Sequence, residues 1–372
     1  MYKIRRTKTG DMDIAMQMYE HSRALMRNAG NDKQWTNGYP SPEVIAGDIA
    51  KENSYIIEHE GTPCGIFAFV LGKDPTYRLI VDGQWESDNR PYGTIHRLAK
   101  REGYHGVGKA CFEWCKTMAT SLRVDTHSQN NTMQHILEET GFVKRGIIFV
   151  SDGSPRIAYQ MLNTKRLCSP LTEYIEKNAI PLYKDFDAAH DERHVRHVLE
   201  NSLRLAEECN ADKNMVYTVA AYHDIGLGKN REMHHVISKE ILTNDHNLHK
   251  WFDQQQIETM GDAVEDHRAS SKREPRSLYG KIISDADRDI DPERVVERAT
   301  QYSIDHFPDY SKEQLWIRTH THLMEKYSRQ GYLKLWLNQP SNIERLGILH
   351  NTIDDEEETR RLFEITYSKT SR

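Results

Sequence analysis

The sequence predicts a mixed α/β domain followed by an all-α domain. Up to about residue 165, short runs rich in β-branched and aromatic residues alternate with helical segments, as expected for a mixed sheet with flanking helices. Beyond that point apolar residues recur at i, i+3, i+4 spacing almost throughout, which is typical of amphipathic helices. A chain of 372 residues also exceeds what one hydrophobic core ordinarily supports. We therefore expect two domains, at residues 1–165 and 166–372.

The composition excludes several classes of protein. The net charge is −6 with no long block of lysine or arginine, so a nucleic-acid polymer is not expected as a partner. The longest apolar run, residues 64–72, is less than half of the roughly 20 residues that a membrane span needs. The first residues lack the apolar core of a signal peptide, and the 5 cysteines lack paired metal spacing. We expect a cytoplasmic protein that acts on small molecules, with no membrane partner; its oligomeric state is left open.

The elements of the first domain follow from local patterns. Glycine or asparagine at the ends of apolar runs marks turns and helix caps, and two pairs of runs joined by short polar turns predict hairpins. The expected strands are residues 54–61, 64–72, 93–99, 121–127, 142–150 and 155–162, and the expected helices are 109–120 and 132–140.

The second domain is predicted to be helical by the same reasoning. Its expected helices include residues 194–209, 215–224, 257–267, 292–304 and 314–331. The acidic run at 354–358 opens a last helix, where negative charge is favourable at the helix N-terminus.

The segment TVAAYHDIGLGKN, residues 218–230, ends an apolar helix on His223 and Asp224. A single such pair is more often a buried histidine satisfied by its neighbour. Here, however, further histidines and aspartates lie on or at the ends of other amphipathic helices: His194, His234, His235, His267, Asp285 and Asp287. Nitrogen and oxygen ligands without sulfur suit a divalent ion held between helices. We favour a metal centre over a histidine-rich core.

From about residue 180 to 300 this pattern resembles the HD superfamily of metal-dependent phosphohydrolases. The resemblance implies a divalent ion (Mn, Mg, Fe, Ni, Co or Zn), with His223 and Asp224 at the catalytic centre. It implies four ligands to a first ion, His194, His223, Asp224 and Asp287, and two residues for a second ion, His234 (rather than His235) and His267. Such an ion polarises a phosphoryl oxygen and lowers the pKa of a bound water.

Phosphate recognition is less well marked in the sequence. Members of that superfamily which read His-Asp-Ile-Gly-Lys place a lysine directly after the glycine, whereas here Leu227 stands there and Lys229 comes two residues later. The segment 267–277 offers other cations for a phosphate, namely Arg268, Lys272, Arg273 and Arg276. For each of these cations taken alone, a solvated loop is the favoured explanation.

A glycine-rich turn, residues 101–108, precedes the helix of the first domain. Gly106 and Gly108 let backbone amides approach an anion, which a helix N-terminus also favours. With the strands on either side, this turn resembles the GNAT acetyltransferases over residues 1–162. That family's loop reads Gln/Arg-x-x-Gly-x-Gly/Ala; here Gly103 replaces the first residue. The resemblance implies acetyl-CoA as cosubstrate, bound by Gly106, Val107, Gly108, Lys109 and Ala110 and by Asn130 or Asn131.

The catalytic groups of the first domain are open. The tyrosine that often protonates the leaving thiolate in that family falls at Leu137. Candidate bases are His96, Asp125 and His127, although for each of them a structural role is the favoured explanation. The aromatic segment 34–40 could line an acceptor site or cap the core.

The sequence therefore predicts a bifunctional enzyme, an acetyl-CoA-dependent N-acetyltransferase joined to a metal-dependent phosphoester hydrolase whose substrate could be a nucleotide. The alternative is a regulatory protein that binds acyl-CoA and a nucleotide, with a non-catalytic first domain. Leu137 favours that alternative for the first domain, and the metal-ligand set argues against it for the second.

Overall fold

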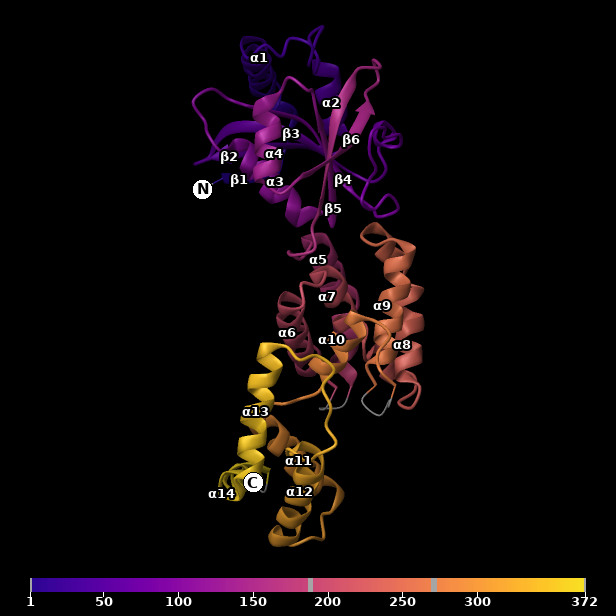
Figure 1. Ribbon diagram of the computed structural model, residues 1–372. Coiled ribbons are helices and arrows are strands. Elements are labelled where there is room, and N and C mark those ends of the chain that lie inside the picture. The colour runs from indigo at the N-terminus through magenta and orange to yellow at the C-terminus, as the bar shows by residue number, and fades with distance from the viewer. Residues whose placement is uncertain (1, 187–189, 269–272, 371–372) are drawn as a thin grey trace. The chain divides into compact units, whose positions relative to one another are not determined.

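The computed structural model describes residues 2–186, 190–268 and 273–370 (Figure 1). Two compact units are present: Met1–Lys177 with Asp245–Ile257, and Asn178–Asn244 with Glu258–Arg372. The first is α/β and the second helical, as the sequence predicts. The first unit also contains α5 (Ser169–Asn178) and η5 (His246–Lys250). Division of the chain at residue 165 into independently folding domains remains a prediction.

The first unit is built on one seven-stranded sheet in the order β1-β2-β3-β4-β5-β7-β6. All neighbouring strands are antiparallel except β4 and β5, which are parallel. The strands are β1 (Tyr2–Arg6), β2 (Ser54–His59), β3 (Thr62–Leu71), β4 (Gly93–Lys100), β5 (Ser121–Thr126), β6 (Val143–Phe149) and β7 (Pro155–Leu162). Both predicted hairpins are present, as β2–β3 and β6–β7.

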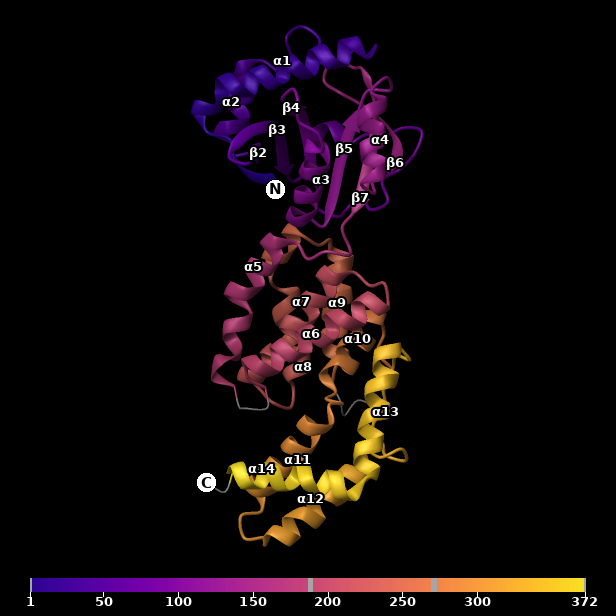
Figure 2. The same cartoon turned by 90° about the vertical axis from the view of Figure 1, so that its left-hand side faces the viewer.

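Helices cover both faces of this sheet (Figure 2). On one face, α1 (Met12–Asn28) and α2 (Pro42–Ala50) pack on Ile56 and Ile66. On the other, α3 (Val107–Met118) and α4 (Asn131–Glu139) pack on Ile95 and Val124. The short helices η1 (Thr9–Asp11) and η2 (Pro75–Tyr77) lie between these elements in sequence. Since side chains alternate between faces along a strand, each strand contributes to both cores.

The parallel strands β4 and β5 separate soon after they pair. Their register covers only Gly93 to Ile95 opposite Leu122 to Val124, although β4 continues to Lys100. The β3–β4 ladder shifts register between Ile66 and Ala68, and Arg97 adopts a left-handed φ of 52°. Bulges of this kind bend a strand away from its neighbour. The sheet is therefore open at the carboxyl ends of β4 and β5.

The second unit consists of helices, most of which begin at a side-chain cap. Asp191 caps α6, Asp212 caps α7, Ser277 caps α10 and Asp291 caps α11 through backbone N–H groups. The elements are η3 (Ile180–Asp185), α6 (Glu192–Glu208), α7 (Lys213–Tyr222), η4 (Ile225–Gly228), α8 (His234–Thr243), most of α9 (Gln254–Asp266), α10 (Leu278–Asp287), α11 (Pro292–His306), α12 (Lys312–Tyr327), α13 (Pro340–Asp354) and α14 (Glu356–Thr370).

The predicted helices are all present in this unit, and Glu356–Glu358 occupy the first turn of α14, as the acidic run indicates. Helices α11 to α14 share a core of their own around Val296, Leu323 and Phe363. No helix within the described ranges has the length and apolar character needed to cross a lipid bilayer.

We predict that fragments ending at Lys165 and starting at Pro170 fold separately. A fragment from Pro170 keeps α5 together with residues 245–257, so the packing of Tyr174 on Trp251 (ring centroids 5.5 Å apart) survives. The cut removes the hydrogen bond from Thr120 Oγ1 to the Trp251 carbonyl (2.8 Å), which costs about 1 kcal/mol. Both fragments should melt cooperatively, and the second should retain metal. Aggregation of the helical fragment would refute the division.

Candidate metal centre and cofactor pocket

Four histidines and two aspartates from five helices converge in the second unit. His194 lies in the first turn of α6, and His223 and Asp224 follow α7 directly. His234 begins α8, His267 follows α9, and Asp287 ends α10. All but His234 and Asp287 are nearly inaccessible to solvent, at 8% exposure or less.

The two oxygens of the Asp224 carboxylate face different histidine pairs. Oδ2 lies 3.6 Å from His194 Nε2 and 3.3 Å from His223 Nε2. Oδ1 lies 3.4 Å from His234 Nε2 and 3.2 Å from His267 Nε2. Asp287 Oδ1 joins the first pair, 3.2 Å from His194 Nε2 and 3.8 Å from His223 Nε2. His194 and His223 with Asp224, and His234 and His267 with Asp224, form two groups of ligand size that share one carboxylate.

Backbone contacts orient three of the imidazoles. Nδ1 of His223 lies 2.8 Å from the Ala220 carbonyl, and Nδ1 of His234 lies 2.8 Å from the carbonyl of Arg231. His267 makes the same contact with Val264. Since a carbonyl can only accept, each Nδ1 carries the proton and each Nε2 presents a lone pair to the centre.

The Nε2 atoms approach one another closely. His194 and His223 are 3.2 Å apart at these nitrogens, and His234 and His267 are 3.3 Å apart. Two lone pairs at this distance repel unless a proton or a cation lies between them. Neutral imidazoles are typical ligands of divalent transition metals, and carboxylates also bind Mg²⁺ and Mn²⁺. The residues present fit such an ion.

The charges of the centre are strongly coupled. Burial lowers the pKa of His194, but the carboxylates of Asp224 and Asp287 outweigh it and raise that pKa to about 9. Burial opposes ionisation of Asp224, yet His223, His194 and His267 hold the pKa of its carboxyl well below the usual range. Without an ion, the centre holds a proton on an imidazole near neutral pH. Metal binding would displace that proton.

Tyr183 and Gly226 fix the position of Asp224 and of α8. The Tyr183 hydroxyl accepts from the Asp224 N–H (3.2 Å) and donates to the Ala221 carbonyl (3.1 Å). A Cβ on Gly226 would lie 2.4 Å from the His234 carbonyl oxygen, so only glycine lets η4 approach α8 this closely. The role of Tyr183 is not predictable from the sequence, because nothing local distinguishes it from the other tyrosines of the chain.

Other candidates of the second half have different roles. The neighbour of His234, His235, is outside the centre and its Nδ1 is buried without a hydrogen-bond partner in the described chain. Asp285 is a structural carboxylate: it accepts from the backbone N–H groups of Trp336 (2.8 Å) and Leu337 (2.9 Å). Burial raises its pKa to about 6.

The cations predicted to bind phosphate have different surroundings from one another. Arg276 is paired with Asp262, Glu265 and Asp266, so the expectation that it is available for phosphate is wrong. Lys229 is exposed, and Arg268 donates to the Glu232 carbonyl (2.9 Å). Lys272 lies outside the described residues.

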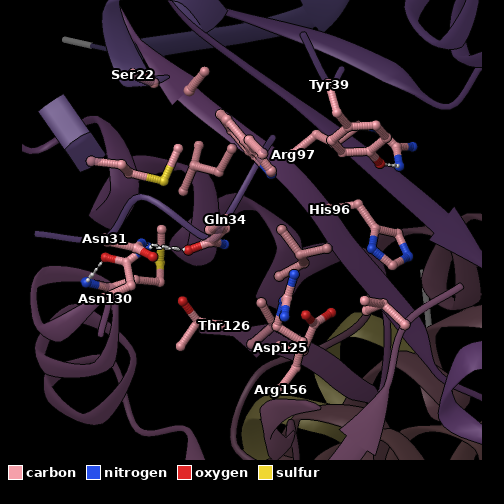
Figure 3. Close-up of a pocket in the computed structure, with 18 of the residues that line it drawn as sticks. Ser22, Asn31, Gln34, Tyr39, His96, Arg97, Asp125, Thr126, Asn130 and Arg156 are labelled. Carbon is pink, nitrogen blue, oxygen red and sulfur yellow. Dashed lines mark hydrogen bonds between the residues drawn. The ribbon is translucent and has the colours of Figure 1, made fainter. Parts of the chain in front are cut away.

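The first unit contains a pocket of about 1070 Å³ where β4 and β5 separate (Figure 3). Its walls come from the first turn of α3, the start of α4, and the ends of β4 and β5. Of the predicted cofactor residues, Val107, Gly108 and Asn130 line it, and so does Asn131. Residues 34–40 take both of the roles that the sequence allows. The residues of this segment that line the pocket are Gln34, Trp35, Thr36, Asn37 and Tyr39, and Trp35 also packs on the core beneath α1.

The start of α3 is shaped for an anion, with one correction to the predicted set. Gly106 occupies the N-cap position with a left-handed φ of 74°. The N–H groups of the first helical turn have no acceptor within their own helix. Ala110 is different, because its N–H donates to the Gly106 carbonyl at 2.9 Å. The amides that could meet a pyrophosphate are therefore those of Val107, Gly108 and Lys109.

Asn130 caps α4 and is held from both ends. Its Oδ1 accepts from the Met133 N–H (3.1 Å), and its Nδ2 donates to Gln34 Oε1 (3.0 Å). Leu137, at the usual tyrosine position, is fully buried in the core beneath α3 and does not line the pocket. It supplies neither a proton nor a contact there.

Two of the three candidate bases line the pocket. His96 Nε2 is 2.9 Å from Asp74 Oδ2, and Asp125 Oδ1 accepts from the Tyr77 hydroxyl at 2.6 Å. His127 is not among the lining residues; its Nδ1 accepts from the Gln129 N–H at 3.2 Å. Asp74 and Tyr77, which orient the other two, come from the segment between β3 and β4, where the sequence shows no motif.

Both halves of the chain are similar to known proteins. Residues 192–289 match the HD domain family. A GNAT-family acetyltransferase from Streptococcus agalactiae is 32% identical, over 43% of this chain and 95% of that protein, with a TM-score of 0.40. A GNAT-family acetyltransferase from Listeria monocytogenes is 15% identical, over 43% and 94%, with a TM-score of 0.35. An aminoglycoside acetyltransferase crystallised with coenzyme A and kanamycin is 16% identical, over 44% and 95%, with a TM-score of 0.32. A search of curated proteins finds no match.

We predict that Tyr183→Phe weakens metal binding without removing a ligand. The change leaves the Asp224 N–H and the Ala221 carbonyl buried without their hydroxyl partner, which costs about 1–3 kcal/mol of stability. Loss of such a supporting contact typically lowers metal affinity about 10- to 100-fold. Titration of the purified variant with Mn²⁺, beside a thermal melt, measures both effects. Wild-type affinity in a destabilised variant would show that Tyr183 supports the fold alone.

Proposed function

Since the N-terminal part of the chain belongs to the GNAT acetyltransferase family and residues 192–289 form an HD domain, we propose that the protein is a bifunctional enzyme. Its second half would hydrolyse a small phosphoester, such as a nucleotide, with divalent metal. Its first half would transfer the acetyl group of acetyl-CoA to an amine. The family assignment of the first half rests on the 32% identity over nearly the whole length of one relative.

One observation carries the hydrolase proposal: each oxygen of Asp224 faces its own pair of imidazole lone pairs. His194, His223 and Asp287 would hold one ion, His234 and His267 a second, and Asp224 both. A divalent ion so held polarises a phosphoryl oxygen and lowers the pKa of a bound water. The buried surroundings of His223 and Asp224 keep these groups from bulk solvent, so the charge of Asp224 and of a bound ion would act on the substrate at low dielectric.

We predict that Asp224→Ala removes both metal and hydrolysis. The variant loses a negative charge and the carboxylate that both ligand groups share. Elemental analysis of the purified protein, with a phosphoester panel under several divalent ions, measures the two effects together. His235→Gln is the matched control, because this histidine adjoins His234 but lies outside the centre. Full metal occupancy in Asp224→Ala would contradict the assignment of Asp224 as a metal ligand.

The acetyltransferase proposal is supported by the pocket between β4 and β5 and by the amides at the start of α3. The helix N-terminus favours a negative pyrophosphate, and beyond the short β4–β5 register the opened sheet leaves backbone groups that could bind the rest of the cofactor. The burial of Leu137 favours the competing view for this half alone, that it senses acyl-CoA without turning it over. A screen of amines for acetyl-CoA consumption separates the two.

We predict that Gly108→Asp abolishes acetyl-CoA binding whereas Gly108→Ala preserves it. A Cβ at this position would make ordinary contacts, 3.6 Å from Ile136 and 3.7 Å from Leu98, so alanine fits. Aspartate adds a negative charge beside the pyrophosphate and should lower affinity by roughly 100-fold or more, since like charges at close range cost several kcal/mol. Calorimetric titration with acetyl-CoA compares the two variants. Equal affinities would place the pyrophosphate elsewhere.

A further inference from the structure

Arg156 is a buried cation without a carboxylate partner. It lies on β7, is 7% exposed and lines the pocket of the first unit. Its Nη1 donates to Ser154 Oγ (2.9 Å) and to the Pro155 carbonyl (3.0 Å). No salt bridge joins it to a carboxylate anywhere in residues 2–186, 190–268 and 273–370. Buried guanidinium groups are almost always paired with an anion, so this one indicates an anion that the chain itself does not supply.

The strand register places Arg156 on the acceptor side of the sheet. Asp125 lies opposite Ala158, two residues from Arg156 on the same face of β7. Ile157 and Tyr159 point to the other face, into the core beneath α3. His96 follows Ile95, which also belongs to that core, so His96 shares the face of Asp125 and Arg156. The start of α3, which is the proposed binding site of the pyrophosphate, lies on the opposite face of the sheet. The anion that would pair with Arg156 is therefore not the cofactor's pyrophosphate.

The same end of the pocket holds a carboxylate suited to an amine. Asp125 accepts from Tyr77 through Oδ1, and Oδ2 has no donor among the described residues. Asp125 and Arg156 are diagonal neighbours across β5 and β7, a spacing of about 7–8 Å between Cα atoms. The other nearby carboxylate, Asp152, is exposed and reaches Arg156 only through Ser154: the Arg156 charge helps to lower the pKa of Asp152, but no direct ion pair joins the two among the described residues. Figure 3 shows Asp125 and Arg156 together at one end of the pocket and His96 to one side.

We propose that the acetyl acceptor is an amino-acid-like zwitterion whose carboxylate binds Arg156 and whose amine lies between Asp125 and His96. This inference rests on the proposed acetyl transfer. His96, positioned by Asp74, takes one proton from the acceptor ammonium and passes it to solvent. The amine nitrogen then forms a bond to the thioester carbonyl carbon, and the carbon–sulfur bond breaks. The nitrogen loses a second proton as the coenzyme A thiolate gains one, so the products are an N-acetyl amino acid, coenzyme A and one proton.

Matched acceptors test the anion site. Each amino acid of a panel is compared with its carboxamide and with its decarboxylated amine, which keep the amine and lack the anion. The wild-type protein should prefer the carboxylate form. Arg156→Gln should lower kcat/KM for that form about 10- to 100-fold, as expected for a lost charged hydrogen bond, and leave the carboxamide within about twofold. Arg156→Lys should recover part of the loss. The matched control is Arg78→Gln, an exposed arginine outside the pocket.

Stability and binding separate a ligand-binding arginine from a structural one. Removal of an unpaired buried charge should leave the melting temperature of the ligand-free protein unchanged or raise it. A large fall in Arg156→Gln, or an equal loss of activity on carboxylate and carboxamide, overturns the proposal. Binding of an N-acetyl amino acid and of its carboxamide, measured with coenzyme A present, tests anion recognition without turnover. If Arg156 discriminates these two but no amine is acetylated, the proposed transferase activity fails while the anion site stands.

Discussion

The carboxylate of Asp224 is the group on which the site of the second unit depends. Each of its two oxygens lies beside two of the four histidines of the centre, so this one side chain contacts all four. The histidines come from helices that are separate in sequence, and Asp224 is common to both ligand groups. A shift of this one side chain would therefore disturb both groups at once. Tyr183 and Gly226 hold it in place, one by hydrogen bonding the backbone and the other by permitting close approach of α8.

The first unit depends on a comparable constraint, the early separation of β4 from β5. Only three residue pairs join β4 to β5. Beyond them, the bulge opposite β3 and the left-handed conformation of Arg97 bend β4 away from β5. This opening connects the two faces of the sheet. One face offers backbone amides at the start of α3, and the other offers the side chains of His96, Asp125 and Arg156. The proposed chemistry requires both, because cofactor and acceptor must meet without sharing their charged contacts.

Both sites lie where regular structure ends. A strand or helix that stops leaves backbone groups unpaired and lets the next side chain point away from the core. His223, Asp224, His267 and Asp287 stand at the last residue of a helix or just beyond it, and Gly106 stands just before one. Such positions can hold charged groups that the interior of a helix would bury without partners. The same property made these residues visible in the sequence, since helix ends are marked by glycine, asparagine and changes of periodicity.

The sequence by itself determined the two fold classes, six of the seven strands, several of the helix ends and the cluster of six residues that includes Asp224. These are local signals: periodicity, caps and the residue types that metal chemistry uses. Tertiary structure decided that the Ala110 N–H bonds within α3, that Arg276 pairs with three carboxylates, and that Arg156 is buried without one. Each of these depends on a side chain or backbone group brought close only by folding, often from a distant part of the chain. Local pattern cannot specify such a partner, because charge and hydrogen bonding are satisfied by whatever lies near in space.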